Sequence, residues 1–141
     1  MADAQPDMGP SGEGITPHLT IAGGRCKNAL AFYAKAFNGT ESFRMPAEDG
    51  ERLLHAHMII HGASLMLSDD FPEFSGRPPM TEPVGVTIHL QVNDADEAWE
   101  LAIGAGADIV MPIGDQFWGA RYGQVKDPFG HRWSIGGPLR K

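Results

Sequence analysis

Alternating polar and apolar residues predict that much of this chain folds as β-strands. In residues 15–21, Thr16, His18 and Thr20 fall on one face of a strand and apolar side chains on the other, because strand side chains alternate between two faces. Residues 112–120 are expected to form a loop. The other predicted strands are residues 40–45, 52–60, 63–68, 86–92, 108–111, 121–126 and 132–135.

The strand at residues 52–60 separates two histidines from an apolar face. His55 and His57 share one side of this strand. The apolar residues expected on the other side are Leu54, Ala56, Met58 and Ile60.

Two segments have helical spacing of apolar residues instead. Residues 28–37 form an amphipathic pattern that stops at Asn38, a residue that tolerates the left-handed conformation at a helix end. Residues 94–103 begin at Asp94, whose carboxylate suits the N-cap position. We therefore predict one helix after the first strand of each half of the chain.

The two halves repeat one another. Residues 86–92 (VTIHLQV) match residues 15–21 (ITPHLTI), so that His89 corresponds to His18. Residues 130–135 similarly match residues 62–67. The pattern indicates an internal duplication of a strand-helix-strand-strand-strand unit.

The duplication predicts the domain organisation. Two small sheets placed edge to edge can curl into a trough lined by their polar faces, and a concave, half-polar surface is the usual form of a ligand site. The predicted segments are a disordered N-terminal arm (1–14), a first module (15–68), a linker (69–83), a second module (84–137) and a C-terminal tail (138–141).

A hairpin over residues 121–135 closes the second module. Its alternation sends Arg132 and Ser134 to the polar face, while Trp133 and Ile135 are expected to pack beneath the second helix. The turn between its strands begins at Asp127, which we expect to cap that turn.

Charge and composition exclude several classes of function. The 141-residue chain has a net charge of -7 and no cluster of lysines or arginines, which argues against nucleic acid or an anionic membrane as its partner. It has no apolar run of membrane-spanning length and no evident secretory signal, so a cytoplasmic location is expected. The single cysteine, Cys26, can form neither an internal disulfide nor a cysteine-based zinc site, and we interpret it as a small neutral residue.

The segment QFWGARYGQVKDPFGHRWSI, residues 116–135, resembles the vicinal oxygen chelate superfamily, and most closely its PhnB-like branch. This superfamily contains glyoxalase I, extradiol dioxygenases and the bleomycin and fosfomycin resistance proteins. The resemblance covers residues 16–135. It implies an α+β fold of two tandem βαβββ modules that form a U-shaped, mostly antiparallel sheet with helices outside, often in a homodimer.

The resemblance also implies where a metal would be bound. The four ligand positions of metal-dependent relatives fall on Thr16, Met66, Thr87 and Ser134. None is a good transition-metal ligand, so we expect no metal and no cofactor. Instead we expect a small organic ligand in the trough, held by a sequestering or accessory protein, with Met66 as an apolar floor.

A second hypothesis uses histidines that lie on the polar strand faces. His18, His55, His57 and His89 could form a shifted metal site in a lyase, isomerase or dioxygenase that polarises adjacent oxygens of its substrate. Otherwise these imidazoles are hydrogen-bonding groups of the ligand site, or His55 and His57 face solvent.

Residues of the Gly-rich hairpin complete the predicted site. Trp118 and Tyr122 offer aromatic faces, and Arg121 offers a cation for an anionic group. Gln91 lies on the His89 face. The ligand-binding residues predicted from the sequence are His18, His55, His57, Met66, His89, Gln91, Trp118, Arg121, Tyr122, Arg132 and Ser134.

Overall fold

The computed structural model of the chain describes residues 8–140. They form two compact units. Of the described residues, the first unit holds 8–34 and 38–81, and the second holds 35–37 and 82–140. Within the described residues, eight strands form two four-stranded sheets, so the predicted α+β class is confirmed. Residues 1–7 of the predicted arm, and residue 141 of the predicted tail, lie outside the described residues.

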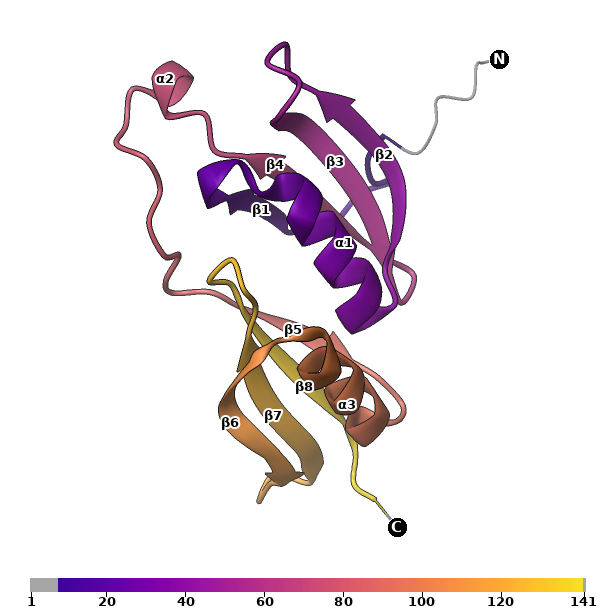
Figure 1. Cartoon of the computed structure of the whole chain (residues 1–141). Coiled ribbons are helices and arrows are strands. Elements are labelled where there is room, and N and C mark those ends of the chain that lie inside the picture. The colour runs from indigo at the N-terminus through magenta and orange to yellow at the C-terminus, as the bar shows by residue number, and fades with distance from the viewer. Residues whose placement is uncertain (1–7, 141) are drawn as a thin grey trace. The chain divides into compact units, whose positions relative to one another are not determined.

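The first module follows the predicted order of elements (Figure 1). In its sheet the strand order is β1-β4-β3-β2; β1 pairs with β4 in parallel, and the other pairs are antiparallel. Its elements are β1 (His18–Ile21), η1 (Ala22–Gly24), α1 (Cys26–Phe37), β2 (Thr40–Pro46), β3 (Leu53–Ile60), β4 (Ala63–Asp69) and α2 (Pro72–Ser75).

The second module repeats this topology. Its strand order is β5-β8-β7-β6, again with the first and last strands parallel. Its elements are β5 (Thr87–Gln91), α3 (Ala95–Ala105), β6 (Asp108–Asp115), β7 (Ala120–Lys126) and β8 (Arg132–Pro138). The duplication inferred from sequence spacing is therefore present in the fold.

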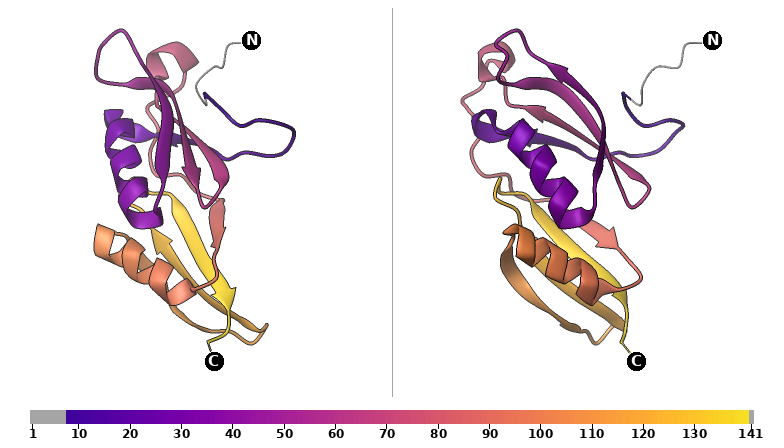
Figure 2. Two further views of the ribbon diagram at one scale, coloured as in Figure 1. Left: turned by 90° about the vertical axis from the view of Figure 1, so that its right-hand side faces the viewer. Right: turned by 45° about the vertical axis from the view of Figure 1, so that its right-hand side comes forward.

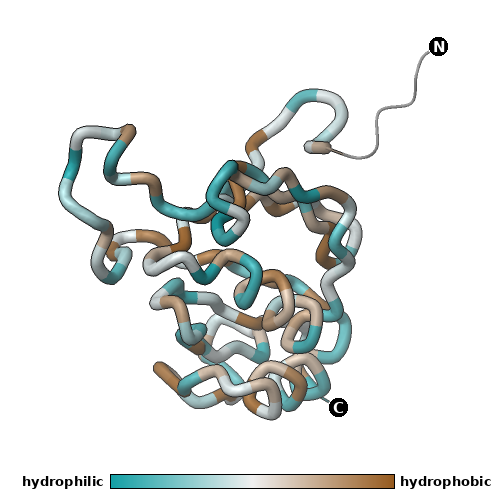
Figure 3. The backbone as a smooth tube through the Cα atoms, turned by 45° about the horizontal axis from the view of Figure 1, so that its top comes forward, coloured by the Kyte–Doolittle hydropathy of each residue, from teal (hydrophilic) through white to brown (hydrophobic). Residues whose placement is uncertain are grey.

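One helix covers one face of each sheet, and apolar side chains fill the space between (Figures 1 and 2). Figure 3 shows colours that change repeatedly between hydrophilic and hydrophobic along the backbone, as expected for strands with two unlike faces. Buried side chains of the first module include Ile21, Leu30, Tyr33, Met58 and Leu67, and those of the second include Leu90, Trp99, Val125, Trp133 and Ile135.

Helix α3 packs closely against β7 because one position of that strand lacks a side chain. A Cβ atom at Gly123 would lie 2.7 Å from Cζ3 of Trp99 and 2.8 Å from the Cα of Ile113. Asp94 caps this helix as predicted, since its carboxylate accepts a hydrogen bond from the Glu97 N–H at 3.1 Å.

The turn of the closing hairpin is organised by Asp127, as predicted. One carboxylate oxygen accepts hydrogen bonds from the N–H groups of Phe129 and His131, each at 2.9 Å, and the other accepts from the Trp133 indole at 3.0 Å. The side chain is buried. A single carboxylate thus fixes both the turn and the main aromatic side chain of β8.

Two local predictions were wrong. The segment predicted as a loop from residue 112 continues β6 as far as Asp115, because Gly114 and Asp115 pair with β7; Pro112 is tolerated because β6 is an edge strand with irregular register. Leu54 was expected on the buried face of β3, but it is 47% exposed and Leu53 is buried. A register shift opposite these residues, between Met45 and Pro46, reverses the alternation there.

No helix among residues 8–140 is long and apolar enough to cross a membrane.

Candidate functional site

The polar face of the second sheet gathers side chains from three adjacent strands. His89 and Gln91 come from β5, Ser134 from β8, and Tyr122 and Gln124 from β7. The register places Ser134 between His89 and Gln124, so these residues form a row across the sheet. Strand alternation, which sends their neighbours toward α3, is what brings them to this face.

His89 is held at both ring nitrogens. Nδ1 lies 2.7 Å from the Ser134 hydroxyl, and Nε2 lies 2.8 Å from the Gln91 amide oxygen. Since an amide oxygen only accepts hydrogen bonds, Nε2 donates to Gln91, and Nδ1 shares its hydrogen bond with the Ser134 hydroxyl. Gly136 makes room for this ring, because a Cβ atom there would lie 2.9 Å from Cε1 of His89.

An aromatic series extends from His89 to the end of the β6–β7 hairpin. The rings of His89 and Tyr122 are stacked, with centroids 5.8 Å apart, and Trp118 meets Tyr122 edge-on at 5.4 Å. Gln124 donates a hydrogen bond to the Tyr122 hydroxyl at 3.1 Å. Trp118 is 52% exposed, so the series ends in a ring that a ligand can reach.

Local turn geometry sets the position of Trp118. The N–H of Gln116 donates to the Ala120 carbonyl at 2.8 Å and closes the turn, in which Gly119 adopts a φ of 91°. A second aromatic ring, Phe117, contacts Trp118 edge-on at 5.1 Å and is almost fully exposed.

Two histidines of the first sheet contact serine hydroxyl groups. His57 is buried between Ser42 and Ser64, with each ring nitrogen 2.8 Å from one of the two hydroxyls. His18 contacts the Ser68 hydroxyl at 3.2 Å. Burial, together with the charge of nearby His55, lowers the pKa of His18 from its ordinary value.

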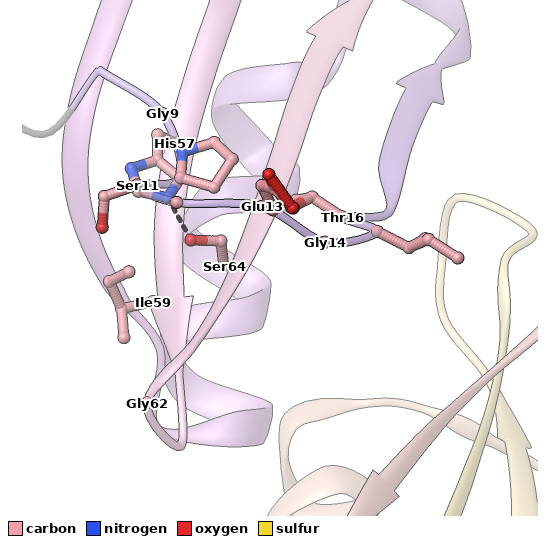
Figure 4. A pocket seen from close by; sticks show the side chains of 12 residues that line it. Gly9, Ser11, Glu13, Gly14, Thr16, His57, Ile59, Gly62 and Ser64 are labelled. Carbon is pink, nitrogen blue, oxygen red and sulfur yellow. Dashed lines mark hydrogen bonds between the residues drawn. The ribbon is translucent and has the colours of Figure 1, made fainter.

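The N-terminal segment lies across the polar face of this sheet, opposite α1 (Figure 2). His55 hydrogen-bonds to the carbonyl of Met8. Between the segment and the sheet is a cavity of about 360 Å³ (Figure 4). Its lining consists of residues 9–16 with His57, Ile59, Gly62 and Ser64.

Arg121 lies on the opposite face of the second sheet from His89. Its guanidinium binds Asp96 of α3 at 2.9 Å and Asp115 at 3.2 Å, and these carboxylates raise its pKa. Arg121 and Tyr122 are neighbours on one strand, so their side chains point to opposite faces. Arg121 therefore does not share the face of the second sheet that holds His89 and Tyr122.

The other predicted site residues belong to strands that contribute side chains to the polar faces of the two sheets. Arg132 is exposed and pairs with Thr87 at the start of β8. Met66 is partly buried and pairs with His18. The residues predicted from the sequence do not include Ser42, Ser64, Ser68 or Gln124. Gln124 follows Tyr122 by two residues on the same strand, so strand alternation alone could have placed it on the same face. Ser42 lies at an irregularity of β2 that the sequence does not show.

The residues at the implied metal positions do not fit a transition metal. Thr16, Met66, Thr87 and Ser134 offer only hydroxyl and thioether groups, and the Ser134 hydroxyl is already bonded to His89. Within residues 8–140, no three His, Cys, Asp or Glu side chains gather into a metal-ligand group. The hypothesis of a shifted histidine set therefore receives no support from the described geometry.

Comparison with known proteins agrees with the fold. The chain is 44% identical over 131 residues to an uncharacterised protein of Mycobacterium bovis, covering 90% of this chain and 84% of the relative. The crystal structure of protein PA1353 from Pseudomonas aeruginosa is similar with a TM-score of 0.75 and 27% identity, covering 92% of this chain and all of the other. The PhnB protein of Bacillus cereus, at 18% identity, shares the fold with a TM-score of 0.68, over 91% of this chain and 100% of its own.

The family model of the Glyoxalase/Bleomycin resistance protein/Dioxygenase superfamily matches residues 15–135. These residues include both modules apart from the last three residues of β8, and all the side chains of the polar faces described above. The chain therefore belongs to the Glyoxalase/Bleomycin resistance protein/Dioxygenase superfamily.

Proposed function

We propose that this protein binds a small organic ligand with a planar or aromatic group, and that it does so without a metal ion. The observation that carries the proposal is the aromatic series of Trp118, Tyr122 and His89 on the polar face of the second sheet. Exposed aromatic edges and faces bind planar groups, and nearby fixed polar groups select among them.

The hydrogen bonds of His89 give this surface a defined polarity. With Ser134 and Gln91 holding the ring, His89 keeps one orientation. A rigid site loses little conformational entropy when a ligand binds. This arrangement suits a sequestering or accessory protein, which needs binding selectivity rather than a reactive group.

Ligand-observed NMR with the planar fragments indole, benzamide and nicotinamide would test the proposal. We expect saturation transfer to at least one fragment, with Trp118→Ala weakening binding by about fivefold because one stacked ring is worth roughly 1 kcal/mol. Tyr122→Phe keeps the ring and is expected to keep most of the affinity.

Ile109→Ala is the control, because Ile109 is an exposed apolar residue of β6 that is not part of the aromatic series. Equal binding by the parent protein and Trp118→Ala would contradict the proposed surface. Transfer to none of the three fragments would contradict the proposed ligand class.

A further inference from the structure

A second, larger groove lies in the first module, between the β2–β3 turn and the segment that follows β4. Its volume is about 620 Å³, which is in the range of small-molecule sites. Its lining consists of Ala47, Glu48, Asp49, Arg52, Leu54, Phe71 and Phe74. None of these residues belongs to the polar strand faces described above.

The floor of this groove is apolar and open to solvent. Phe71 and Phe74 form a ring pair with centroids 6.0 Å apart. Phe74 is 79% exposed, and Leu54 is turned outward by the register shift opposite β3. Three large apolar side chains thus share one exposed concave surface, an arrangement that marks interaction sites on soluble proteins.

Arg52 fixes the two walls of the groove to one another. Its guanidinium binds Asp49 of the turn at 2.7 Å and Glu73 of α2 at 2.5 Å. It also lies 4.3 Å from the centroid of the Phe71 ring. Because two carboxylates already neutralise this cation, Arg52 does not offer a free positive charge to an anionic ligand.

The rim of the groove is net negative. Glu48, Asp49 and Glu73 carry three negative charges, against one positive charge on Arg52. At the same turn Glu51 adds a negative charge, and Lys27, which donates to the turn backbone at 3.2 Å, adds a positive one. Hydrogen bonds from the N–H groups of Arg52 and Glu51 lower the pKa of Asp49 to about 2, so it stays ionised at neutral pH. An apolar floor beneath a negative rim is complementary to an apolar cation.

We propose that this groove binds an aromatic organic cation. The planar rings of such a ligand stack against Phe71, Phe74 and Leu54, and its positive charge lies beside the carboxylates of the rim. Burial of aromatic surface supplies most of the affinity, and the charge selects cations over neutral or anionic compounds of the same shape.

Fluorescence titration with 9-aminoacridine, a planar cation at neutral pH, tests the proposal against two compounds of different charge. The neutral parent acridine and the anion anilinonaphthalene sulfonate are the comparisons. At low salt we expect the cation to bind about tenfold more tightly than acridine, and the anion to bind most weakly. Added salt should reduce the preference for the cation.

Two variants locate the site. Phe74→Ala removes a side chain that is 79% exposed, so the fold should persist, and about a tenfold loss of 9-aminoacridine affinity is expected. Glu48→Gln should lower affinity for the cation while leaving acridine binding unchanged. Circular dichroism and thermal melting confirm that each variant is folded.

Matched controls lie in the second module. Ile109→Ala removes another exposed apolar side chain, and Glu100→Gln removes another exposed carboxylate. Both should bind 9-aminoacridine like the parent protein. The proposal is overturned if Phe74→Ala binds like the parent, if Ile109→Ala loses affinity equally, or if acridine binds as tightly as the cation.

Discussion

His89, Ser134 and Gln91 show how single residues define the candidate ligand face. Each ring nitrogen of His89 has one hydrogen-bond partner, and the absence of a side chain at Gly136 leaves room for the ring. On the first sheet His57 is similarly held, by two serines. Hydrogen bonds therefore fix the ring orientation of both histidines.

At the residue scale, His18 predicts a pH dependence of stability. Its pKa in the folded protein is lowered from 6.5, by burial first and by His55 second. The unfolded chain therefore takes up this proton more readily as pH falls below about 6.5, which favours unfolding. At higher pH, His18 should not change the free energy of unfolding. As the pH falls below about 6.5, the protonation of His18 in the unfolded chain should lower the free energy of unfolding.

Urea unfolding of the parent protein and of His18→Gln at neutral and mildly acidic pH measures this effect. The variant should lose less stability than the parent between the two conditions. An equal loss in both proteins would show that His18 does not contribute.

Cys26 gives a second prediction at this scale. The side chain is fully buried, and burial followed by the charge of Asp69 raises the pKa of its thiol to about 12. Because the thiolate is the reactive form, alkylation by iodoacetamide should be at least about a hundredfold slower in the folded protein than in guanidinium chloride. Mass spectrometry over time measures both rates, and rapid labelling of the folded protein would contradict the burial.

At the scale of elements, the β7–β8 hairpin depends on the carboxylate of Asp127. It accepts three hydrogen bonds, from two backbone N–H groups and the Trp133 indole, in a buried position. Its removal takes away the acceptor of these hydrogen bonds in a buried part of the second module.

Asp127→Ala should therefore lower the free energy of unfolding by about 2–4 kcal/mol. Chemical denaturation monitored by tryptophan fluorescence measures the change. Asp108→Ala, which removes an exposed aspartate from β6, is the control and should change stability by less than about 0.5 kcal/mol. Similar effects of the two substitutions would show that the turn does not need its carboxylate.

At the scale of the whole molecule, the chain consists of two modules with the same strand order, each with its own helix and buried side chains. Each module therefore has a polar sheet face of its own. The homodimer implied by the family resemblance stays a prediction. Light scattering should give twice the chain mass of 15.2 kDa if it is right, and a single chain mass would contradict it.

The amino-acid sequence by itself determined that the module is repeated. For most of the site residues, it also determined which face of the strand the side chain occupies. His18 and His89 were matched by spacing, and strand alternation placed Gln91 and Ser134 on the His89 face, because a strand has a fixed period of two. The same period could have excluded Arg121, which is adjacent to Tyr122 and cannot share its face.

Only the tertiary structure decided which partners these side chains have. Asp96, which binds Arg121, is 25 residues away in the sequence, and Ser134 is 45 residues from His89. Leu54 faces solvent because of a register shift in the neighbouring strand, and the N-terminal segment crosses the first sheet through contacts such as that of Met8 with His55. Such contacts depend on strand pairing and chain path, which local residue patterns do not encode.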